Sequence, residues 1–501
     1  MKKARLIFIL IFVVAAGVRL VRVWQPVNTT SWREADLSAI ARNYYREGMN
    51  PFYPRIDWRG TGPGFTEMEF PLYPWTVALF YQAFGVHEII ARLLSYALSL
   101  LTLYLFFQLA QRLLPMVGAA IASLCFALSP LPIFAATAIH AEGLMLFGYV
   151  AAAYTFIKWV EEGAEKDYWL AIAATALTIL AKASAAHIGL LFAVLLLSSK
   201  GFRALRQPRV WLFGIAALSP GLLWYMHAHQ LWLTWGNSMG LSNEYPWAGP
   251  DLLTNQAFLR GITKLELTEV WIPAGVIGGV VAVLLGWRIR SVRISLVWLA
   301  ACMIFYLVAA RTTMDNWAFY YHIFSAAPVA LMTGAGVEIL RRIPFTRKLG
   351  LSGAFTWGMV AVLLLAFAVQ GRKVYAQQAP FAPDEYQCIR GFASAIPGNA
   401  LILASGGPCT DADGYRVAWN ASYIFYWLDR RGFNICEGEQ SLDAVRALAR
   451  RGAEYFVADK TALHKKPGFE AELRSQYQAL AECGTAVLFR LTPPAPPAGA
   501  P

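Results

Sequence analysis

The sequence is poor in charged residues. Asp, Glu, Lys and Arg make up 15% of its 501 residues, against 57% hydrophobic residues, and the mean hydropathy is +0.45. Soluble globular domains usually carry about 25% charged residues, so this composition excludes an ordinary soluble protein. Apolar runs of roughly 15 to 20 residues alternate with short basic clusters, a pattern typical of a chain that crosses a membrane several times.

Signals for nucleic-acid, nucleotide or zinc binding are also missing from the sequence. The net charge is +12, but no soluble segment carries a Lys/Arg stripe with interleaved aromatic residues, so we expect no nucleic-acid partner. The segment Ser405-Gly406-Gly407-Pro408 is typical of a turn rather than a phosphate loop. No Cys-x-x-Cys or Cys/His spacing indicates a structural zinc site.

The first apolar run, Leu6 to Val18, sets the expected orientation. Lys2, Lys3 and Arg5 precede it, which is typical of a cytoplasmic start. A signal peptide is the alternative interpretation, but no small-x-small cleavage site follows cleanly, and a charged residue stands where a cleavage region should be neutral. We therefore predict an uncleaved anchor whose far end is extracytoplasmic.

Ten further apolar segments give a predicted total of eleven spans. The short loops on the cytoplasmic side are rich in Lys and Arg, as the positive-inside rule requires. Eleven spans that start inside place everything after Gly371 outside, and we expect the inner (plasma) membrane of a bacterium. The further spans are predicted at 88–111, 116–134, 141–159, 168–181, 186–198, 210–226, 268–287, 294–310, 323–340 and 350–370.

The composition changes at the same boundary. Residues 1–371 carry 29 basic and 18 acidic side chains, whereas residues 372–501 carry 14 and 13. The predicted fold class is thus mostly α, a polytopic membrane helix bundle, with a small C-terminal α/β soluble domain at 372–492 and a disordered Pro-rich tail at 493–501. In this domain we predict strands at 400–405, 454–458 and 485–491, and helices at 422–431, ending at Gly432, and 441–451, ending at Gly452.

Four of the six cysteines lie after Gly371. Cys388, Cys409, Cys436 and Cys483 can form two disulfides in an oxidising compartment, with three possible connectivities, and buried free thiols are the alternative. Cys125 and Cys302 lie within apolar spans.

Two outside loops, about 24–87 and 227–268, are longer than ordinary connectors. In the first loop, Leu37, Ile40 and Tyr44 recur at helical spacing, which predicts an amphipathic helix on the membrane surface that ends at Gly48. The acidic residues Asp57, Glu67 and Glu69 follow it. The loop therefore brings several carboxylates to one membrane face.

Four motifs carry a resemblance to a known family. They are W-R-E-A-D...I-A-R-N-Y-Y-x-E-G in the first long loop, E-F-P-L-Y-P-W before the next helix, Ala91-Arg92-Leu93 at a span start, and Tyr320-Tyr321-His322 leading to Pro328. With the outside C-terminal domain, they make the chain similar to the polytopic GT-C glycosyltransferases, in the branch of the protein O-mannosyltransferases and the aminoarabinose transferase of lipid A. The resemblance implies transfer of a sugar from a polyprenyl-phosphate donor to an acceptor on the outer face.

The chain departs from the family pattern at two places. Arg33-Glu34 stands where many relatives have an adjacent Asp-Glu pair, with Asp36 two residues later, and Glu69-Phe70-Pro71-Leu72 replaces a Lys-Pro-Pro-Leu motif. A sugar phosphate already has a reasonable leaving group, so inverting transfer needs one carboxylate base, plus cations for the departing phosphate. We predict Asp36 as the base and Glu34 as the second choice. A solvated or capping carboxylate is the alternative for either residue.

Other charged or polar residues at span ends are candidate substrate-binding groups. Glu69 can bind the sugar, the acceptor or a divalent cation; no metal site is assigned. Lys182 either marks an outside hairpin or reaches a phosphate, and the guanidinium groups of Arg92 and Arg311 either hold phosphate or snorkel to lipid headgroups. Tyr321 is a further substrate-binding candidate, and His322 either contacts a phosphate or sugar hydroxyl or is structural.

Three functions compete at this stage. A lipid-linked sugar transferase fits the acidic outside loops, and its partners are the donor, the membrane and a lipid, glycan or protein acceptor. A secondary transporter would normally show broken spans in two related halves, which the sequence lacks. A binding or assembly protein could use the outer domain for recruitment, but many spans and a long acidic-aromatic loop are excessive for an anchor.

Overall fold

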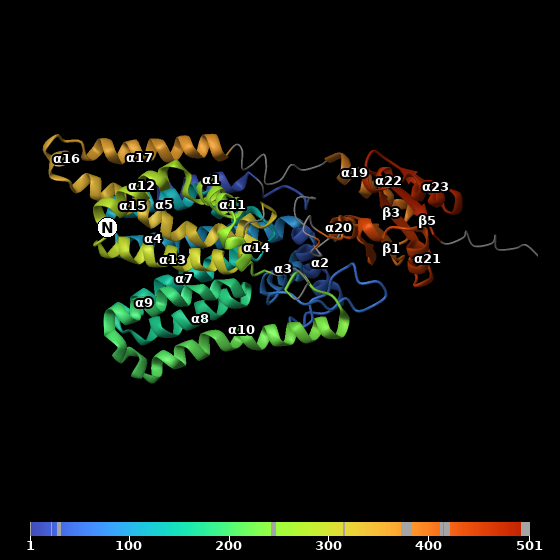
Figure 1. Ribbon diagram of the computed structural model, residues 1–501, viewed down its shortest axis with the longest axis horizontal. Helices are drawn as coiled ribbons and strands as arrows, with labels where there is room; N and C mark the ends of the chain where they lie inside the picture. The colour runs from blue at the N-terminus through green and yellow to red at the C-terminus, as the bar shows by residue number, and fades with distance from the viewer. Residues whose placement is uncertain are drawn as a thin grey trace, which may run out of the picture. The chain divides into compact units, whose positions relative to one another are not determined.

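The computed structural model describes residues 2–21, 23–27, 32–241, 247–313, 316–371, 383–410, 414 and 421–491. The chain divides into two compact units, both seen in Figure 1. Unit 1 comprises Met1–Trp24, Arg92–Trp224 and Pro246–Gln378, and unit 2 comprises Gln25–Ala91, Tyr225–Tyr245 and Ala379–Pro501. The predicted tail at 493–501 lies outside the described residues.

Unit 1 is built from helices. They are α1 (Lys2–Leu20), α4 (Glu88–Leu113), α5 (Met116–Leu128), α6 (Pro130–Thr137), α7 (Glu142–Glu162), α8 (Glu165–Ala181), η1 (Ala183–His187), α9 (Ile188–Lys200), η2 (Gly201–Arg206), α10 (Pro208–Trp235), η3 (Pro250–Thr254), α11 (Gln256–Leu265), η4 (Glu266–Trp271), α12 (Ile272–Gly286), α13 (Arg290–Val308), α14 (Ala310–Thr313), η5 (Asn316–Ser325), α15 (Ala326–Arg342), α16 (Pro344–Lys348), α17 (Ser352–Ala366) and η6 (Phe367–Gly371), of which α4 begins and α10 ends in unit 2.

The number of membrane-spanning candidates is lower than the eleven that we predicted. Within the described residues, eight helical segments are long and apolar enough to cross a bilayer, or nine if α5 and α6, bent by 56°, form one span. The apolar part of α1, Leu6–Leu20, and the 17-residue α8 fall short of the roughly 20 residues that a bilayer requires. The predicted membrane helix bundle is confirmed, but its span count is not.

The break between α5 and α6 has a local cause. Ser129 precedes Pro130, and a residue before proline disfavours helical backbone; Ser129 accordingly has φ −65° and ψ 135°. The carbonyl of Ala127, left over at the end of α5, accepts a hydrogen bond from Arg19 Nη1 at 2.8 Å, and Arg19 Nε donates to Ser99 Oγ at 2.9 Å. The predicted single span at 116–134 is therefore two helices.

Helix α15 is the most buried of the candidate spans. It packs against α5 and α12, and glycine makes both approaches close. A Cβ atom at Gly334 would lie 2.2 Å from the carbonyl oxygen of Gly118, and one at Gly336 would lie 2.2 Å from that of Gly278. Close backbone contact at small residues is the usual way in which membrane helices associate.

Unit 2 combines two helices of the first long loop with a C-terminal sheet. Its elements are α2 (Trp32–Glu47), α3 (Leu72–Phe84), α19 (Pro383–Gly391), η7 (Phe392–Ala395), β1 (Ile402–Ser405), α20 (Ser422–Leu428), β2 (Gly432–Ile435), η8 (Glu437–Glu439), α21 (Leu442–Arg450), β3 (Tyr455–Asp459), α22 (Lys460–Lys465), α23 (Pro467–Gln476), β4 (Gln478–Glu482) and β5 (Ala486–Arg490). The second predicted loop is shorter than 227–268, since α10 extends to Trp235 and α11 begins at Gln256.

The C-terminal sheet is mixed, in the order β2-β1-β3-β5-β4. Strand β1 pairs in parallel with β2 and β3, whereas β5 is antiparallel to β3 and β4. The three predicted strands are confirmed. The helix predicted at 422–431 ends earlier, because Asp429 turns the backbone to φ +55° and Gly432 begins β2. The mostly exposed strand β4 has no apolar alternation and was not predicted.

Helix α2 begins and ends near the predicted residues but is not a surface helix. Its last residue is Glu47, and Gly48 has φ +124°, which glycine adopts without strain. All residues from Glu34 to Tyr44 are buried. A helix with one exposed polar face was therefore the wrong expectation: the polar side chains of α2 are buried too, and they need partners inside the protein.

Four cysteines of unit 2 form two disulfides, the first of the two alternatives that the sequence left open. The pairs are Cys388–Cys483 and Cys409–Cys436, separated by 95 and 27 residues. Cys125 and Cys302, in unit 1, are buried free thiols. Only the folded chain selects one of the three connectivities, because the pairing depends on which segments the sheet brings together.

Candidate active site

Five carboxylates of the first long loop are buried in unit 2. Glu34, Asp36, Asp57, Glu67 and Glu69 are each at most 7% exposed. Transfer of a carboxylate from water to a protein interior is unfavourable unless hydrogen bonds or cations compensate. The partners of each group therefore indicate which carboxylate is structural and which remains available for chemistry.

Asp57 is held by cations and amides on α2. Arg42 Nη2 donates to Asp57 Oδ2, and Asn43 Nδ2 donates to Asp57 Oδ1 at 2.9 Å. Arg42 Nη1 also lies 2.9 Å from Asp429 Oδ1, at the end of α20. This network joins α2 to the C-terminal part of unit 2, so Asp57 has a structural role.

Glu67 and Glu69 are held as well. Ser238 Oγ donates to Glu67 Oε2 at 2.7 Å, and His229 Nδ1 lies 3.4 Å from Glu67 Oε1. Arg33 Nη2 donates to Glu69 Oε1 at 2.9 Å, which places the predicted substrate-binding Glu69 in an ion pair. A ligand of Glu69 would have to share this carboxylate with Arg33.

Asp36 differs from these groups. Its side chain is 1% exposed, and Trp58 Nε1 donates to its Oδ1 at 2.9 Å. Burial raises the pKa of Asp36 from 3.8 to about 7, although the nearby side chains of Ser422 and Trp58 lower it. Ser422 Oγ does not reach hydrogen-bond geometry, and Asp36 Oδ2 has no hydrogen-bond partner among the described residues.

These properties make Asp36 suited to proton transfer. A general base works best when its pKa lies near the operating pH, and it needs a lone pair that no other donor occupies. Glu34, the second choice, is also buried on α2, at 7% exposure. The structure thus buries both candidates, and their assignment as base stays a prediction.

A second cluster lies in unit 1 around Lys182. Lys182 lies between α8 and η1, where its backbone is extended, with φ −163° and ψ 114°, and its side chain is buried. Its Nζ forms an ion pair with Glu142 Oε1, and Glu142 Oε2 contacts His140 Nδ1. The ammonium lies 4.0 Å from the centroid of the Tyr321 ring and 4.5 Å from that of Tyr320.

This cluster brings together two predicted residues, Lys182 and Tyr321. It also contains three residues that were not predicted as site residues: His140, Glu142 and Tyr320. Aromatic faces stabilise a cation without neutralising it, so the ammonium retains its charge in an enclosed place. Because Glu142 already pairs with this ammonium, an anionic ligand would have to share Lys182 with Glu142.

His322 belongs to a different network. Its Nδ1 lies 2.7 Å from Glu266 Oε1, and its Nε2 lies 2.8 Å from the carbonyl oxygen of Thr313. Ser325 Oγ is within 3.0 Å of both oxygens of Glu266. Both nitrogens of the predicted substrate-binding His322 are therefore engaged within unit 1.

The two predicted arginines are engaged as well. Arg92 is 3% exposed, and its Nη1 donates to the carbonyl oxygen of Thr137 at 2.7 Å. Arg311 Nη2 lies 2.6 Å from Asp251 Oδ2. The assignment of both arginines to phosphate binding stays a prediction.

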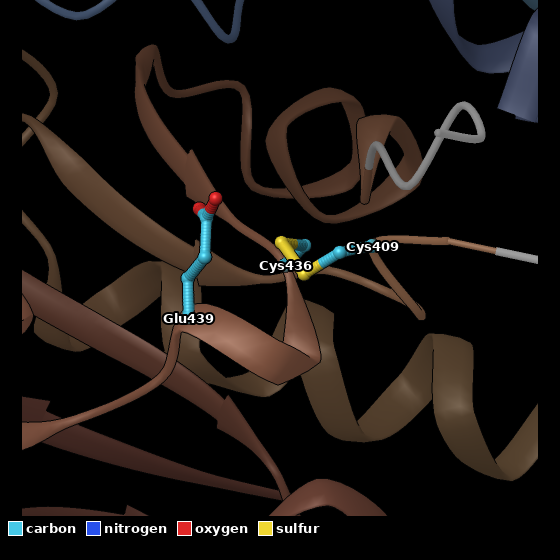
Figure 2. A group of neighbouring side chains, drawn as sticks. All are labelled: Cys409, Cys436 and Glu439. Atoms are coloured by element: carbon cyan, nitrogen blue, oxygen red, sulfur yellow. A yellow bond between two sulfur atoms is a disulfide. The ribbon is translucent and has the colours of Figure 1, made fainter. Parts of the chain in front are cut away.

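One group among the described residues has the spacing of a metal site. Cys409 Sγ, Cys436 Sγ and a carboxylate oxygen of Glu439 lie within 4.8 Å of one another. Figure 2 shows the two sulfur atoms joined in the disulfide, with Glu439 beside them. A metal ligand must be a free thiolate, so this group does not fit a metal ion, and the metal stays unassigned.

A protein-family model matches part of the chain. The model of the dolichyl-phosphate-mannose-protein mannosyltransferase family matches residues 68–224, less than half of the chain. This stretch includes Glu69, Arg92 and Lys182. None of the curated protein sequences compared with the chain matches it significantly.

Solved structures match over nearly the whole chain. Apo ArnT from Cupriavidus metallidurans has a TM-score of 0.67 at 14% identity, covering 97% of this chain and 98% of ArnT. The same ArnT bound to undecaprenyl phosphate has a TM-score of 0.63 at 13% identity, covering 97% of each chain. The Archaeoglobus fulgidus oligosaccharyltransferase has a TM-score of 0.55 at 11% identity, covering 90% and 69%. At such identities the likeness shows the fold.

Proposed function

We propose that this chain, which has the fold of the GT-C membrane glycosyltransferases, moves a sugar with inversion from a polyprenyl-phosphate donor to a hydroxyl acceptor on the extracytoplasmic face. The environment of Asp36 carries the proposal: a buried carboxylate with a pKa of about 7, whose Oδ2 accepts no hydrogen bond from the residues that the structure describes. The ArnT structure with undecaprenyl phosphate supports a lipid-linked donor, since that protein shares the fold.

The proposed reaction requires one base and one cation. Asp36 takes the proton of the acceptor hydroxyl while the acceptor oxygen bonds to the anomeric carbon. The bond from that carbon to the phosphate oxygen breaks, and its electron pair leaves with the phosphate. A fixed cation stabilises the charge that develops on a departing phosphate, and Lys182 of unit 1 is the proposed candidate for that role.

The function is tested by transfer from a panel of polyprenyl-phosphate sugars to lipid, glycan and protein hydroxyl acceptors. Purified full-length chain should convert at least one donor, and the product should have the opposite anomeric configuration to that donor. Retention of configuration would contradict the single-base mechanism, and uptake of substrate into vesicles without transfer would favour a transporter.

The pH dependence of kcat/KM should follow the ionisation of Asp36. Because the base must be ionised, kcat/KM for the acceptor should rise with pH through about 7, the raised pKa of this carboxyl. In Trp58→Phe the carboxylate loses a stabilising hydrogen bond, so the midpoint should move to higher pH by about one to two units, since bonds to charged groups are worth about 1.5 to 3 kcal/mol. A midpoint that stays in place would contradict the assignment.

The two disulfides support an extracytoplasmic C-terminal part, because disulfides persist in oxidising compartments. Engineered thiols test this orientation. An impermeant maleimide added outside intact cells should label Ser475→Cys, an exposed position on α23, but not Ser198→Cys, an exposed position near the basic loop after α9. The reverse labelling pattern would overturn the orientation.

A further inference from the structure

Glu266 is a buried carboxylate within an apolar segment. It begins the π-helical turn η4, inside the candidate span Gln256–Gly286, and is 5% exposed. Trp271 Nε1 donates to its Oε2 at 3.1 Å, in addition to the contacts with His322 and Ser325. An ionisable group in a membrane-spanning segment is costly, and it usually marks a functional place with a specific partner.

The partners of Glu266 fix the position of the short segment η5. The carbonyl oxygen of Thr313 can only accept, so His322 Nε2 carries a proton and donates to it. His322 Nδ1 and Glu266 Oε1 share a second hydrogen bond, and Ser325 closes the segment at its other end. The network therefore fixes both the approach to η5 and its last residue.

The backbone at the end of η4, six residues after Glu266, is strained. Ile272, directly after η4, has φ +44°, a conformation that β-branched residues rarely adopt. Such a residue persists only where the surrounding contacts determine the backbone, and strained backbone concentrates at functional sites. Ile272 is 2% exposed, so packing on all sides holds it.

The segment held by this network carries the rings over Lys182. Tyr320 and Tyr321 precede His322 directly in η5, and their ring centroids lie 4.5 Å and 4.0 Å from Lys182 Nζ. A ring contact with a cation weakens steeply when the ring shifts or turns away. The placement of both rings thus depends on where η5 is anchored.

We propose that Glu266 is a positioning residue for the donor phosphate: through His322 and Ser325 it fixes η5 so that Tyr320 and Tyr321 enclose the Lys182 ammonium. The inference rests on the proposed function, in which Lys182 binds that phosphate. Glu266 does not touch the donor itself. Its loss should therefore weaken donor binding while leaving the chemistry at Asp36 intact.

The test compares Glu266→Gln with Glu338→Gln in the purified full-length chain. Glu338 is also a buried glutamate of unit 1, but it pairs with Arg341 and Arg342 at the far end of α15. Glu266→Gln should raise the donor KM and the Kd for undecaprenyl phosphate about tenfold, with kcat and acceptor KM within about twofold of wild type. Glu338→Gln should leave all four constants near wild type.

Combining Glu266→Gln with substitutions of Tyr320 and Tyr321 distinguishes a positioning role of Glu266 from a general loss of stability. If Glu266 acts through η5, Glu266→Gln should add little to the donor KM in a Tyr320→Leu, Tyr321→Leu background. Equal effects in both backgrounds, or a fall in kcat with unchanged donor KM, would overturn the inference. Lys182→Met is the reference: if it leaves Kd unchanged, the proposed function of this site fails instead.

Discussion

Asp36→Asn should lower turnover by about 10²- to 10⁴-fold, the usual contribution of a general base. Asparagine keeps the shape of the side chain and can still accept from Trp58, but it cannot take a proton from the acceptor. The donor Kd should stay near the wild-type value, because the phosphate is assigned to other groups. Single-turnover transfer and donor binding measured on the same preparation check both expectations.

The stability of the same variant provides a control. The folded-state pKa of Asp36 lies above its ordinary value of 3.8, so folding favours the protonated form. The contribution of the protonated Asp36 carboxyl to the free energy of unfolding is greatest below about pH 4 and is lost as pH rises through about 7. Asp36→Asn, which carries no charge, should therefore be at least as stable as wild type at pH 8. If the variant is instead much less stable, its inactivity would reflect loss of the fold and not loss of the base.

Two neighbouring variants test the choice of base. Glu34→Gln and Glu69→Gln should each retain far more turnover than Asp36→Asn. Glu69→Gln breaks the ion pair with Arg33, so its expected effect is on KM. Near-normal turnover of Asp36→Asn together with an inactive Glu34→Gln would show that Glu34 is the base.

Lys182→Met should weaken binding of the polyprenyl-phosphate donor by about 10- to 100-fold, because a hydrogen bond to a charged group contributes about 1.5 to 3 kcal/mol. The effect should appear in donor KM and in the Kd for undecaprenyl phosphate. Acceptor KM should not change. Titration of the purified protein with undecaprenyl phosphate in detergent measures the Kd directly.

Removal of Lys182 alone leaves Glu142 without its cation, which can destabilise unit 1. The double variant Lys182→Met, Glu142→Gln removes both charges and should restore stability without restoring donor binding. Lys158→Met is the matched control, since Lys158 also pairs with a carboxylate of unit 1, Asp167, at 3.0 Å. Equal donor binding in the double variant and wild type would contradict the role of Lys182.

The acidic loop was predictable because its signals are local. Asp36 and Glu34 lie within one helical turn of each other, and the helix ends at a glycine, so spacing alone placed the two carboxylates on one element. The partner of Asp36 was not predictable in this way. Trp58 is 22 residues away, and Ser422 belongs to the C-terminal part of the chain. The raised pKa therefore depends on contacts that spacing does not encode.

The partners of Lys182 could not be predicted from the sequence either. A lysine between two apolar runs stands out in the sequence, but its carboxylate partner is 40 residues earlier. His140, Glu142 and Glu266 were not among the predicted site residues. The Lys182 cluster forms because α7 packs against α8 and η5, whereas Glu266 on η4 belongs to the separate network of His322.

Hydrophobicity and charge along the chain were sufficient to determine a membrane helix bundle, a distinct C-terminal α/β part and an acidic loop, because these features arise from neighbouring residues. Tertiary structure decided the lower span count, the pairing of the four cysteines, and which buried charges have partners. The physical reason is the same in each case: the energy of a buried charge, a thiol or a helix end depends on the groups that packing places around it.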